Sequence, residues 1–188
     1  MPANSLHPTL WRTCRVLAND TRLRLFAQLA REQPQNVSQL AAQCALTLPV
    51  ASQSLRALEA RGLLKVRRIR LRVEYRLPAP AELGTQASLL AALKNALRRD
   101  PKFTVVVIRL ATAFTHPSRI EIYRALQSGP KTALQIQTLI RLSSLALNRH
   151  LAKLLARKFV RFNESDETYT SLKHAHPIGQ ALGEMAQA

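Results

Sequence analysis

The sequence predicts a mainly helical protein with small β-hairpins, in which one order of elements occurs twice. Three observations indicate this organisation: a helical stretch that leads into an arginine-rich alternating segment, a second half that repeats the first, and an amphipathic segment between the halves. The chain has 188 residues and 47% hydrophobic content, which is enough for one large domain or two small ones with cores.

The first half begins with short helices. We expect them over residues 11–18, over residues 21–30 and from the cap Asn36 through Gln43. Asn19 can cap the second of them, because its side-chain oxygen can accept a backbone N–H bond in the first helical turn. In that helix Leu23, Phe26 and Leu29 recur at a spacing of three, with Leu25 beside them, which predicts its buried face.

A fourth helix follows, and the rest of the chain is organised to present it. Ala51, Leu55 and Leu58 recur at spacings of four and three, which predicts an inward stripe. The polar residues left on other faces are Ser52, Gln53 and Arg56. These side chains are therefore free to reach a partner outside the domain.

Three residues mark the ends of this helix. Thr47 can accept a backbone N–H bond with its side chain and so cap the first turn. Pro49 is tolerated because it falls in that turn, where its missing N–H has no intrahelical partner. Gly62 can end the helix because glycine adopts the left-handed conformation without steric cost.

Residues 65–77 alternate between basic and apolar side chains, which is typical of a two-stranded hairpin. The basic set is Lys65, Arg67, Arg68, Arg70, Arg72 and Arg76, and the apolar set is Val66, Leu71, Val73, Tyr75 and Leu77. A period of two predicts the apolar set on one face and most of the cations on the other. An ordinary hairpin with a solvated basic face is the alternative, and the density of arginine favours a contact with nucleic acid.

Charge narrows the range of partners. Lys and Arg number 28 against 11 Asp and Glu, which gives a formal net charge of +17. Such a chain is attracted to polyanions, of which nucleic acid and anionic membrane are the usual ones. The longest apolar run, residues 104–114, is interrupted by Arg109 and is shorter than the roughly 20 residues of a membrane span. The N-terminus lacks the layout of a secretory signal, so we expect a cytoplasmic protein.

The sequence contains no motif that is typical of a metal site or of an enzyme. Cys14 and Cys44 are the two cysteines, and in a cytoplasmic protein we expect them to be reduced and partly buried. His174 and His176 have no carboxylate or cysteine beside them, so we expect no metal site there. The five glycines are scattered and form no phosphate-binding loop, and we expect neither an enzyme nor a cofactor.

The second half repeats the first. The segment from Thr115 to Ile120 lies over that from Ala18 to Leu23 at an offset of 97 residues, and Thr132 takes the capping role of Asn36. At an offset of 96, Leu151, Leu154 and Arg157 take the places of Leu55, Leu58 and Arg61. The difference of one residue is a loop deletion, so we predict two homologous domains. Helix, short turn, helix and hairpin, in that order, form a winged helix-turn-helix.

Residues 82–99 between the halves predict an amphipathic helix, with Leu83, Leu90 and Leu97 spaced by seven and Ala87 and Leu93 in the same stripe. Asp100-Pro101 stop this helix, which either packs on its own domain or is shared between domains. Residues 104–108 are β-branched and locally favour a strand, but the repeat favours a helix equivalent to 11–18. The last helix, over 178–185, would be the counterpart of 82–99.

Several segments resemble, in order and spacing, the ArsR-type winged-helix transcriptional regulators of bacteria: LANDTRLRLFAQLA, NVSQLAAQCALT, SLRALEARGLLKVRR and RVEYRL. The resemblance covers Trp11 to Leu77 well and Ile108 to Leu172 more weakly. Members of this family usually form homodimers through their first and last helices and bind a palindromic operator. The resemblance implies two tandem winged helix-turn-helix domains arranged as an intramolecular pseudo-dimer, with Leu90 and Leu97 near its pseudo-twofold axis. The division that we expect is 9–77 and 102–173 for the two domains, 78–101 for the linker and interface helix, and 174–188 for the C-terminal helix.

The same resemblance implies which residues contact DNA. In the first domain they are Thr47, Ser52, Gln53 and Arg56 of the recognition helix and Arg67, Arg68, Arg70 and Arg72 of the wing; in the second they are Ser144, Asn148, Arg149 and Lys153. The sequence departs from the family at the wing tip, where Ile69-Arg70 stands in place of an acidic residue and glycine. It departs also at the second wing, residues 163–167, which is acidic and should be repelled by phosphate. The ligand sets of metal-sensing members have no match, so we expect no metal sensing.

The function that these patterns favour is sequence-specific binding of duplex DNA by a transcriptional regulator. We expect a monomer with internal pseudo-twofold symmetry, and further dimerisation is open. A nucleic-acid-binding accessory protein in replication, conjugation or RNA binding is an alternative, as is a winged-helix scaffold for protein–protein contacts. Aromatic residues make up 5% of the chain, which offers few stacking platforms for single strands.

Overall fold

The computed structural model describes residues 9–70, 72–84 and 86–188, so Leu71, which we expect on the apolar face of the wing, lies outside the described residues. What we call the first unit consists of α1 (Leu10–Leu17), α2 (Asp20–Arg31), β1 (Gln35–Asn36), α3 (Val37–Gln43), α4 (Leu48–Glu59), β2 (Lys65–Ile69) and β3 (Arg72–Arg76). A short 3-10 turn, Pro80–Glu82, and α5 (Ala87–Arg99) follow. The second unit consists of α6 (Phe103–Ala111), α7 (Pro117–Ala125), a 3-10 turn (Leu126–Ser128), β4 (Lys131–Thr132), α8 (Ala133–Ile140), α9 (Ser144–Ala156), β5 (Val160–Asn163) and β6 (Thr168–Ser171), and α10 (Pro177–Gln187) comes last.

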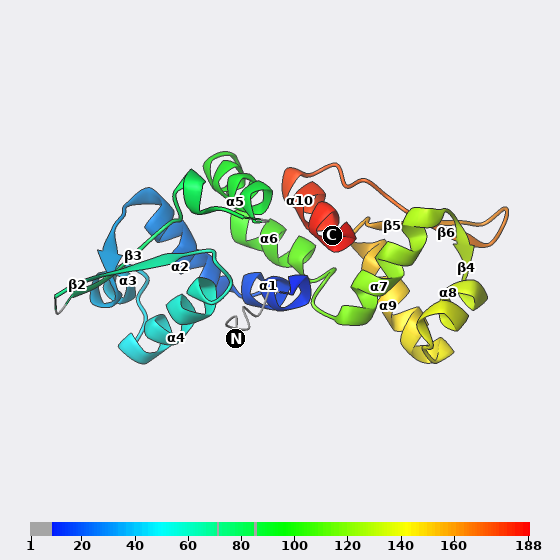
Figure 1. Ribbon diagram of the computed structural model, residues 1–188, viewed down its shortest axis with the longest axis horizontal. Coiled ribbons are helices and arrows are strands. Elements are labelled where there is room, and N and C mark those ends of the chain that lie inside the picture. Colours follow the sequence, from blue (N-terminus) through cyan, green and yellow to red (C-terminus); the bar gives the residue numbers. More distant parts are fainter. Residues whose placement is uncertain (1–8, 71, 85) are drawn as a thin grey trace, which may run out of the picture.

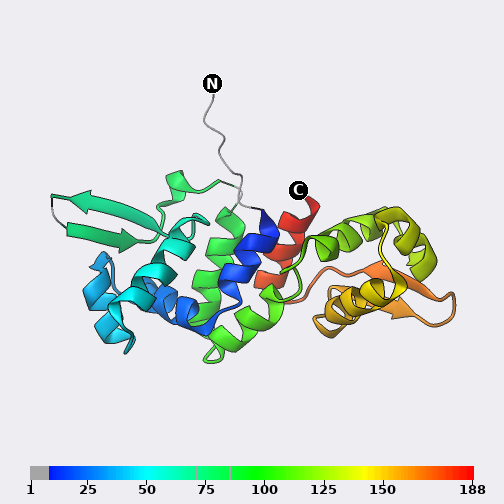
Figure 2. The same ribbon diagram turned by 90° about the horizontal axis from the view of Figure 1, so that it is seen from below.

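The molecule is elongated, with the two units at opposite ends and α1, α5, α6 and α10 between them (Figure 1). The helix α4 and the paired helices α8 and α9 reach the same lower edge of that view, whereas α5 lies at the upper edge. In Figure 2 the hairpin of β2 and β3 extends outward from the helices of the first unit. The predicted fold class, mainly helical with small β-hairpin wings, is therefore confirmed.

The predicted caps position the helices of both units. The Asn19 Oδ1 accepts the N–H of Arg22 at 3.0 Å, at the start of α2. Asn36 and Gln39 exchange backbone-to-side-chain bonds of 2.9 Å at the start of α3, and Thr132 and Gln135 form the same reciprocal pair at α8. Because each cap satisfies N–H groups that the helix itself cannot, it fixes where the helix begins.

The helix expected over residues 82–99 is shorter than predicted, since α5 begins at Ala87. Glu82 is held in the preceding turn, where its carboxylate accepts two bonds from Arg76, of 2.6 and 2.7 Å, and one from the Ala79 N–H at 2.7 Å. Ala87 is exposed and Leu83 lies outside the helix, so neither belongs to the stripe as predicted. The buried face of α5 consists of Leu89, Leu90, Ala92, Leu93 and Ala96.

Residues 104–108 are helical, as the repeat predicted against their local β propensity, and they lie in α6. The last helix is also confirmed, as α10. The wing, in contrast, is more than a two-stranded hairpin. The two-residue strand β1 pairs with β3, with Gln35 opposite Tyr75, and β4 pairs with β6 in the same way, so each unit has a three-stranded sheet.

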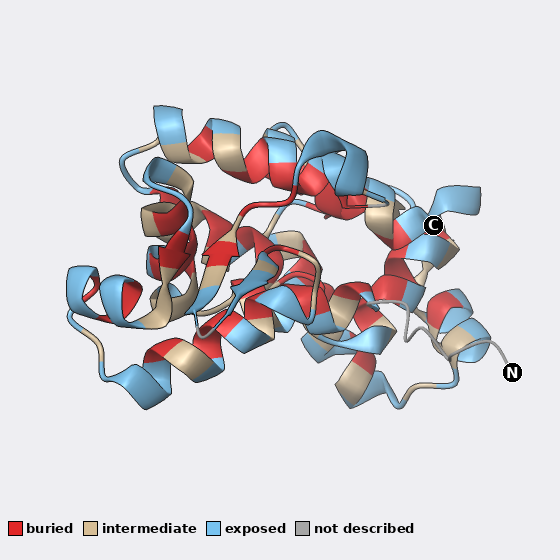
Figure 3. Ribbon diagram, turned by 60° about the vertical axis from the view of Figure 1, so that its left-hand side comes forward, coloured by how far each residue is buried: buried red, intermediate tan, exposed pale blue. Residues whose placement is uncertain are grey.

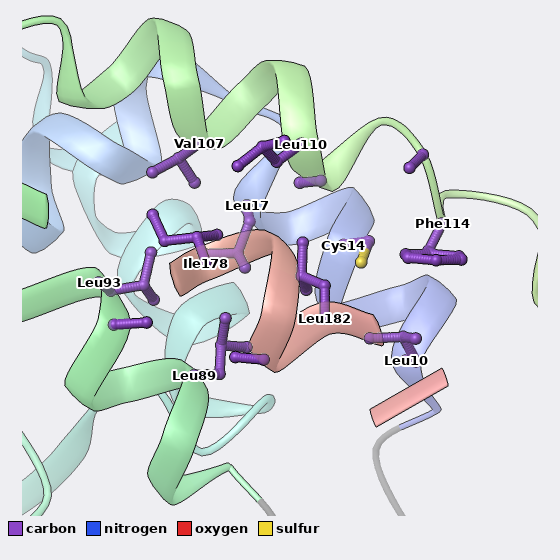
Figure 4. Close-up of a cluster of buried hydrophobic side chains, with 14 of the residues drawn as sticks. Leu10, Cys14, Leu17, Leu89, Leu93, Val107, Leu110, Phe114, Ile178 and Leu182 are labelled. Carbon is purple, nitrogen blue, oxygen red and sulfur yellow. The ribbon is translucent and has the colours of Figure 1, made fainter. Parts of the chain in front are cut away.

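A hydrophobic core shared by both halves of the chain joins the units. α10 packs against α5, α6 and α1, and α1 packs against α6. Figure 4 shows side chains from these four helices meeting in one cluster, among them Leu17, Leu93, Val107 and Leu182. The helix α5 is thus shared between the halves rather than confined to the first. Leu90 is buried, but Leu97 is only partly buried and lines a surface hollow with Arg31 and Arg98.

Exposed and buried faces separate along most helices, as the pale-blue and red turns of Figure 3 show. Cys14 and Cys44 are confirmed as free cysteines, and they are buried. Burial raises the pKa of both thiols, so both remain protonated near neutral pH. Across the part of the chain that the structure describes, no helix has the length and apolar character needed to cross a membrane.

Candidate nucleic-acid interface

The helix α4 is fixed by its inner face and open on its outer face. Ala51, Leu55 and Leu58 are fully buried, as the spacing predicted, and Ser54 joins them. Gln53 and Arg56 are exposed, and Ser52 is partly buried between the two faces. The helix therefore presents an amide and a guanidinium three residues apart on one outer face.

The N-terminus of α4 differs from the prediction in one bond. Thr47 occupies the cap position and is exposed, but its side chain accepts no cap bond from any described residue. Pro49 explains part of this, because a cap residue bonds the second or third N–H of the helix and Pro49, the second residue, has none. At the other end Gly62 adopts a φ of +66°, as predicted.

The first turn of α4 also carries two exposed apolar residues that the pattern did not predict. Leu48 is 54% exposed and Val50 is 43% exposed. Leu48 lies three residues before Ala51 and seven before Leu55, so periodicity alone assigns it to the buried stripe. The first residues of a recognition helix are those that contact base edges, and apolar side chains there can contact thymine methyl groups.

The register of the wing places its side chains by face. Val66 pairs with Tyr75 and Arg68 with Val73, which puts these four on one face of the hairpin. Lys65 pairs with Arg76, Arg67 with Glu74 and Ile69 with Arg72, which puts these six on the opposite face. Most of the cations share one face, as predicted. Arg68 lies on the apolar face, however, and Ile69 lies among the cations.

Tyr75, on β3, is buried, and burial, followed by the charge of Glu59, raises the pKa of its hydroxyl. The charges of Arg56 from α4 and Arg68 from β2 oppose that rise. Both arginines are exposed, so α4 and the wing each present a guanidinium to solvent in the same unit.

The cations of the wing differ in how free they are. Arg76 is bound to Glu82 at 2.6 Å in a partly exposed ion pair, and that hydrogen bond, with one from Ala79, holds the pKa of Glu82 at about 2. Arg67, Arg68, Arg70 and Arg72 are all exposed. Arg70 adopts the left-handed conformation, with a φ of 54°, and Ile69 and Arg72 pair across the turn. The hairpin thus closes although its tip lacks glycine.

The predicted residues of the second recognition helix lie on the outer face of α9. Ser144, Asn148, Arg149 and Lys153 are exposed, and the buried face consists of Leu147, Leu151 and Leu154. The caps of α4 and α9, Thr47 and Ser143, correspond at an offset of 96. On that alignment Asn148 and Arg149 match Ser52 and Gln53. Ser144 and Lys153 stand one position beyond the residues that match Thr47 and Arg56, and Ala152 takes the place of Arg56.

The second wing is shorter and negatively charged at its tip. It has four paired rungs where the first wing has five. Glu164, Asp166 and Glu167 are exposed in its turn. Hydrogen bonds from Thr168 lower the pKa of Asp166, so this carboxylate stays ionised at neutral pH. The negative charge predicted for this wing therefore lies on the surface, where a binding partner would meet it.

The predicted residues form two groups rather than one. Those of α4 and the first wing lie at one end of the molecule, and those of α9 lie at the other end on the same lower edge of Figure 1. Within the described residues, no group of three or more histidine, cysteine, aspartate or glutamate side chains is placed to hold a metal ion.

Comparison with protein families gave one match, in two segments of the chain. A family model described as a helix-turn-helix domain matches residues 17–67 and residues 114–161, together just over half of the chain. The first segment spans α2 to the start of β2, and the second spans α7 to the start of β5. A search of curated proteins found no match.

Proposed function

Because the chain belongs to the helix-turn-helix domain family, we propose that it is a transcriptional regulator that binds duplex DNA through α4 and the first wing. The observation that carries this proposal is that one unit exposes Gln53 and Arg56 on the outer face of α4 and four arginines on the adjoining wing. A duplex that meets α4 in its major groove then meets the wing arginines beside it.

Each predicted side chain has a distinct role in this proposal. Gln53 and Arg56 pair with adenine and guanine edges, and each good bidentate contact contributes roughly 1–3 kcal/mol of discrimination. Thr47 and Ser52 bond phosphate or base edges at the start of the helix. Arg67, Arg68, Arg70 and Arg72 neutralise phosphates or enter the minor groove and add affinity with little sequence information.

The finer family assignment and the domain division belong to the same proposal. The resemblance to ArsR-type regulators supports domains over 9–77 and 102–173, joined by the linker and interface helix of 78–101, with a C-terminal helix over 174–188. The shared core of α1, α5, α6 and α10 supports an internal counterpart of the dimer that such regulators form from two chains. A single chain then needs no second copy to present two recognition helices.

The second unit contributes to the proposed DNA contact through α9. Residues 102–173 contain twelve Lys and Arg against four acids, close to the thirteen against four of residues 9–77, so the acidic wing does not make the second domain acidic. Asn148 and Arg149 of α9 would read bases, with Ser144 and Lys153 beside them. If both helices enter major grooves, their half-sites lie about 34–36 Å apart. Because Gln53 corresponds to Arg149, the preferred site is asymmetric.

Footprinting on the DNA upstream of the protein's own gene tests the proposal. We expect a protected site, with duplex preferred over single strands in competition. The triple variant Arg68→Ala, Arg70→Ala, Arg72→Ala should weaken binding and should lower the log–log salt slope by about 0.9 for each phosphate that the wing no longer neutralises.

The matched control removes three other exposed arginines, with the changes Arg31→Ala, Arg98→Ala and Arg99→Ala. It removes the same charge from a different side of the first unit and should leave the salt slope within about one unit of the wild type. Equal salt slopes of DNA binding for the wild type and the wing variant would mean that the wing does not contact DNA. A preference for single strands would favour an RNA-binding or accessory role instead.

A further inference from the structure

A basic groove runs along the side of the first unit, between α2 and the C-terminal end of α5. It consists of two adjoining hollows of about 510 Å³ and 440 Å³, which share Arg31, Leu97 and Arg98. The larger hollow extends to the turn from α5 to α6, and the smaller one reaches Leu77 at the base of the wing. The helix α2 also packs against α6, and Arg31 lines the larger hollow together with Asp100 and Pro101 of the turn from α5 to α6.

The groove is lined by five cations and one acid. The cations are Arg24, Arg31, Lys94, Arg98 and Arg99, and the acid is Asp100. Among the residues that the structure describes, the single ion pair is that of Arg76 with Glu82, so none of the five is paired there. Asp100 is engaged elsewhere, because its Oδ1 accepts the Lys102 N–H at 2.7 Å. Like charges gathered around one hollow repel each other, and a bound anion would relieve that repulsion.

Two of the cations are held in place before any ligand arrives. Arg24 donates to the Cys44 carbonyl at 2.6 Å, and Arg98 donates to the Asn95 Oδ1 at 2.6 Å. Phe103 and Thr104, the first two residues of α6, also line the larger hollow, and the cap residue Lys102 supplies no side-chain acceptor within the described chain. The positive end of the α6 dipole therefore adds to the side-chain charges.

The second unit provides an internal comparison. A hollow of about 590 Å³ occupies the corresponding corner, between α7, the end of α10 and the start of α1. At the offset of 97 that relates α2 to α7, Glu121 takes the place of Arg24, and Glu184 of α10 lines this hollow together with Trp11 and Ile120. The fold thus forms the corner in both halves, but the first half lines it with five cations and one acid, and the second with one cation, Arg124, and two acids. The charge of the groove belongs to this half of the sequence and is not required by the architecture.

The placement of the groove distinguishes its ligand from DNA. The helix α5, which forms one wall, lies at the upper edge of Figure 1, and α4 lies at the lower edge. A duplex seated on α4 at the lower edge would not lie against the α5 wall at the upper edge, although the larger hollow extends to Gln43 and Cys44 at the end of α3. The apolar wall formed by Ala27, Leu97 and Phe103 adds a surface for a ring system, and the volume is within the range of small-molecule sites.

We propose that the basic groove binds a small phosphate-bearing anion no larger than a nucleoside triphosphate. The phosphates contact Arg31, Arg98 and Arg99, and any attached ring lies against Leu97 and Phe103. The site is separate from the proposed DNA interface and does not depend on it.

Isothermal titration of the full chain, without DNA and at constant ionic strength, tests this site with sodium tripolyphosphate, ATP and adenosine. We expect tripolyphosphate and ATP to bind with one site per chain and adenosine not to bind. The variant Arg31→Gln, Arg98→Gln, Arg99→Gln should bind both phosphates at least about tenfold more weakly. The wing variant Arg67→Gln, Arg70→Gln, Arg72→Gln loses the same charge and should bind them within about twofold of the wild type.

Three results would overturn the proposal: no binding of either phosphate by the wild type, equal binding by the groove variant, or an equal loss in the wing variant. A short duplex that displaces tripolyphosphate from the wild type would also overturn it, because the groove would then be part of the DNA interface. Circular dichroism checks that both variants are folded, and the single change Arg31→Gln replaces the groove variant if that variant is not.

Discussion

At the scale of single residues, three histidines act as acceptors of backbone N–H bonds. The Nδ1 of His116 accepts from Ser118 at the start of α7, and the Nδ1 of His176 accepts from Ile178 at the start of α10. The Nδ1 of His174 accepts from His176 at 2.9 Å. A ring nitrogen accepts such a bond only when it carries no proton, so the contact at His174 requires a neutral imidazole. The ring of His150, on α9, lies 4.6 Å from that of His116.

We therefore expect the free energy of unfolding to fall as the pH drops below about 6.5. Burial lowers the pKa of His150, and the charges of His116 and Arg119 lower it further; burial is also the main cause that lowers the pKa of His174. In the unfolded chain these rings take up protons at their ordinary pKa, so the unfolded state binds more protons and gains stability relative to the folded state. Denaturant unfolding at pH 7.5, 6.5 and 5.5 measures the effect.

The variant His150→Gln should lose less stability than the wild type over the same pH range. Glu82 does not interfere, because its contribution is complete above its ordinary pKa and is lost only as the pH falls toward about 2. Identical unfolding free energies at pH 7.5 and pH 5.5 would show that these histidines are not buried as described.

Some contacts of single residues could be predicted from the sequence, and others could not. Asn19 and Asn36 cap their helices as predicted, because a cap bonds an N–H only two or three positions away. The bond that the Leu77 N–H donates to the Gln33 Oε1, at 2.7 Å, joins residues 44 positions apart, and no local pattern reveals it. Alternation could assign cations to the wing but could not show that Arg68 faces away from Arg67, because that depends on the register of the hairpin.

At the scale of elements, left-handed residues recur at the same places in both units. Gly62, after α4, has a φ of 66°, and Lys158, after α9 and 96 positions later, has a φ of 60°. Ala45, between α3 and α4, has a φ of 52°, and Arg141, also 96 positions later, has a φ of 57°. The turns before and after α4 and α9 thus contain a left-handed residue at the same place in both units.

We expect Gly62→Ala to destabilise the protein by about 1–2 kcal/mol, because a left-handed residue with a Cβ is strained by about that amount. The added Cβ would also lie 3.1 Å from the Oε1 of Gln86, which is tighter than an ordinary contact. Gly84→Ala is the matched control, since a Cβ there has no described atom within 4 Å, and its effect should be a few tenths of a kcal/mol. Thermal unfolding of both variants measures the difference, and equal melting temperatures would contradict it.

The boundary of a helix or strand could be predicted where residues next to it determine it, and could not be predicted where distant residues do. The helices α2, α3 and α8 begin at residues whose own side chains cap them. The strands β1 and β4 were not predicted, because a strand of two residues is too short to show an alternating pattern. They are defined by their pairing with β3 and β6. The late start of α5 was missed because Arg76, on the neighbouring strand, holds Glu82 in a turn.

At the scale of the whole molecule, the shared core decides whether the two units behave as one. Leu182 of α10 is fully buried in the cluster of Figure 4, together with Leu89 of α5 and Leu10 of α1. The repeat in the sequence predicted two homologous halves and a helix for each, but it left open whether the helix of residues 82–99 served one half or both. The apolar stripe of residues 82–99 could not decide between these possibilities, because the same pattern of apolar residues results whichever half of the chain covers it.

If this core couples the halves, removing part of it should weaken both at once. Leu182→Ala should lower the free energy of unfolding by about 2–5 kcal/mol, as for other fully buried leucines. Leu145→Ala, at a position 63% exposed, is the control and should change it by less than about 0.5 kcal/mol. The single tryptophan, Trp11, lies on α1 beside the core, so its fluorescence follows the centre of the molecule while circular dichroism follows all the helices. The two signals should give coincident transitions that shift together in Leu182→Ala. The halves would then unfold as one cooperative unit, and the distance between α4 and α9 would be fixed. Separate transitions would mean that the core only tethers two independent domains, and the asymmetric site proposed for the DNA would then have no fixed spacing.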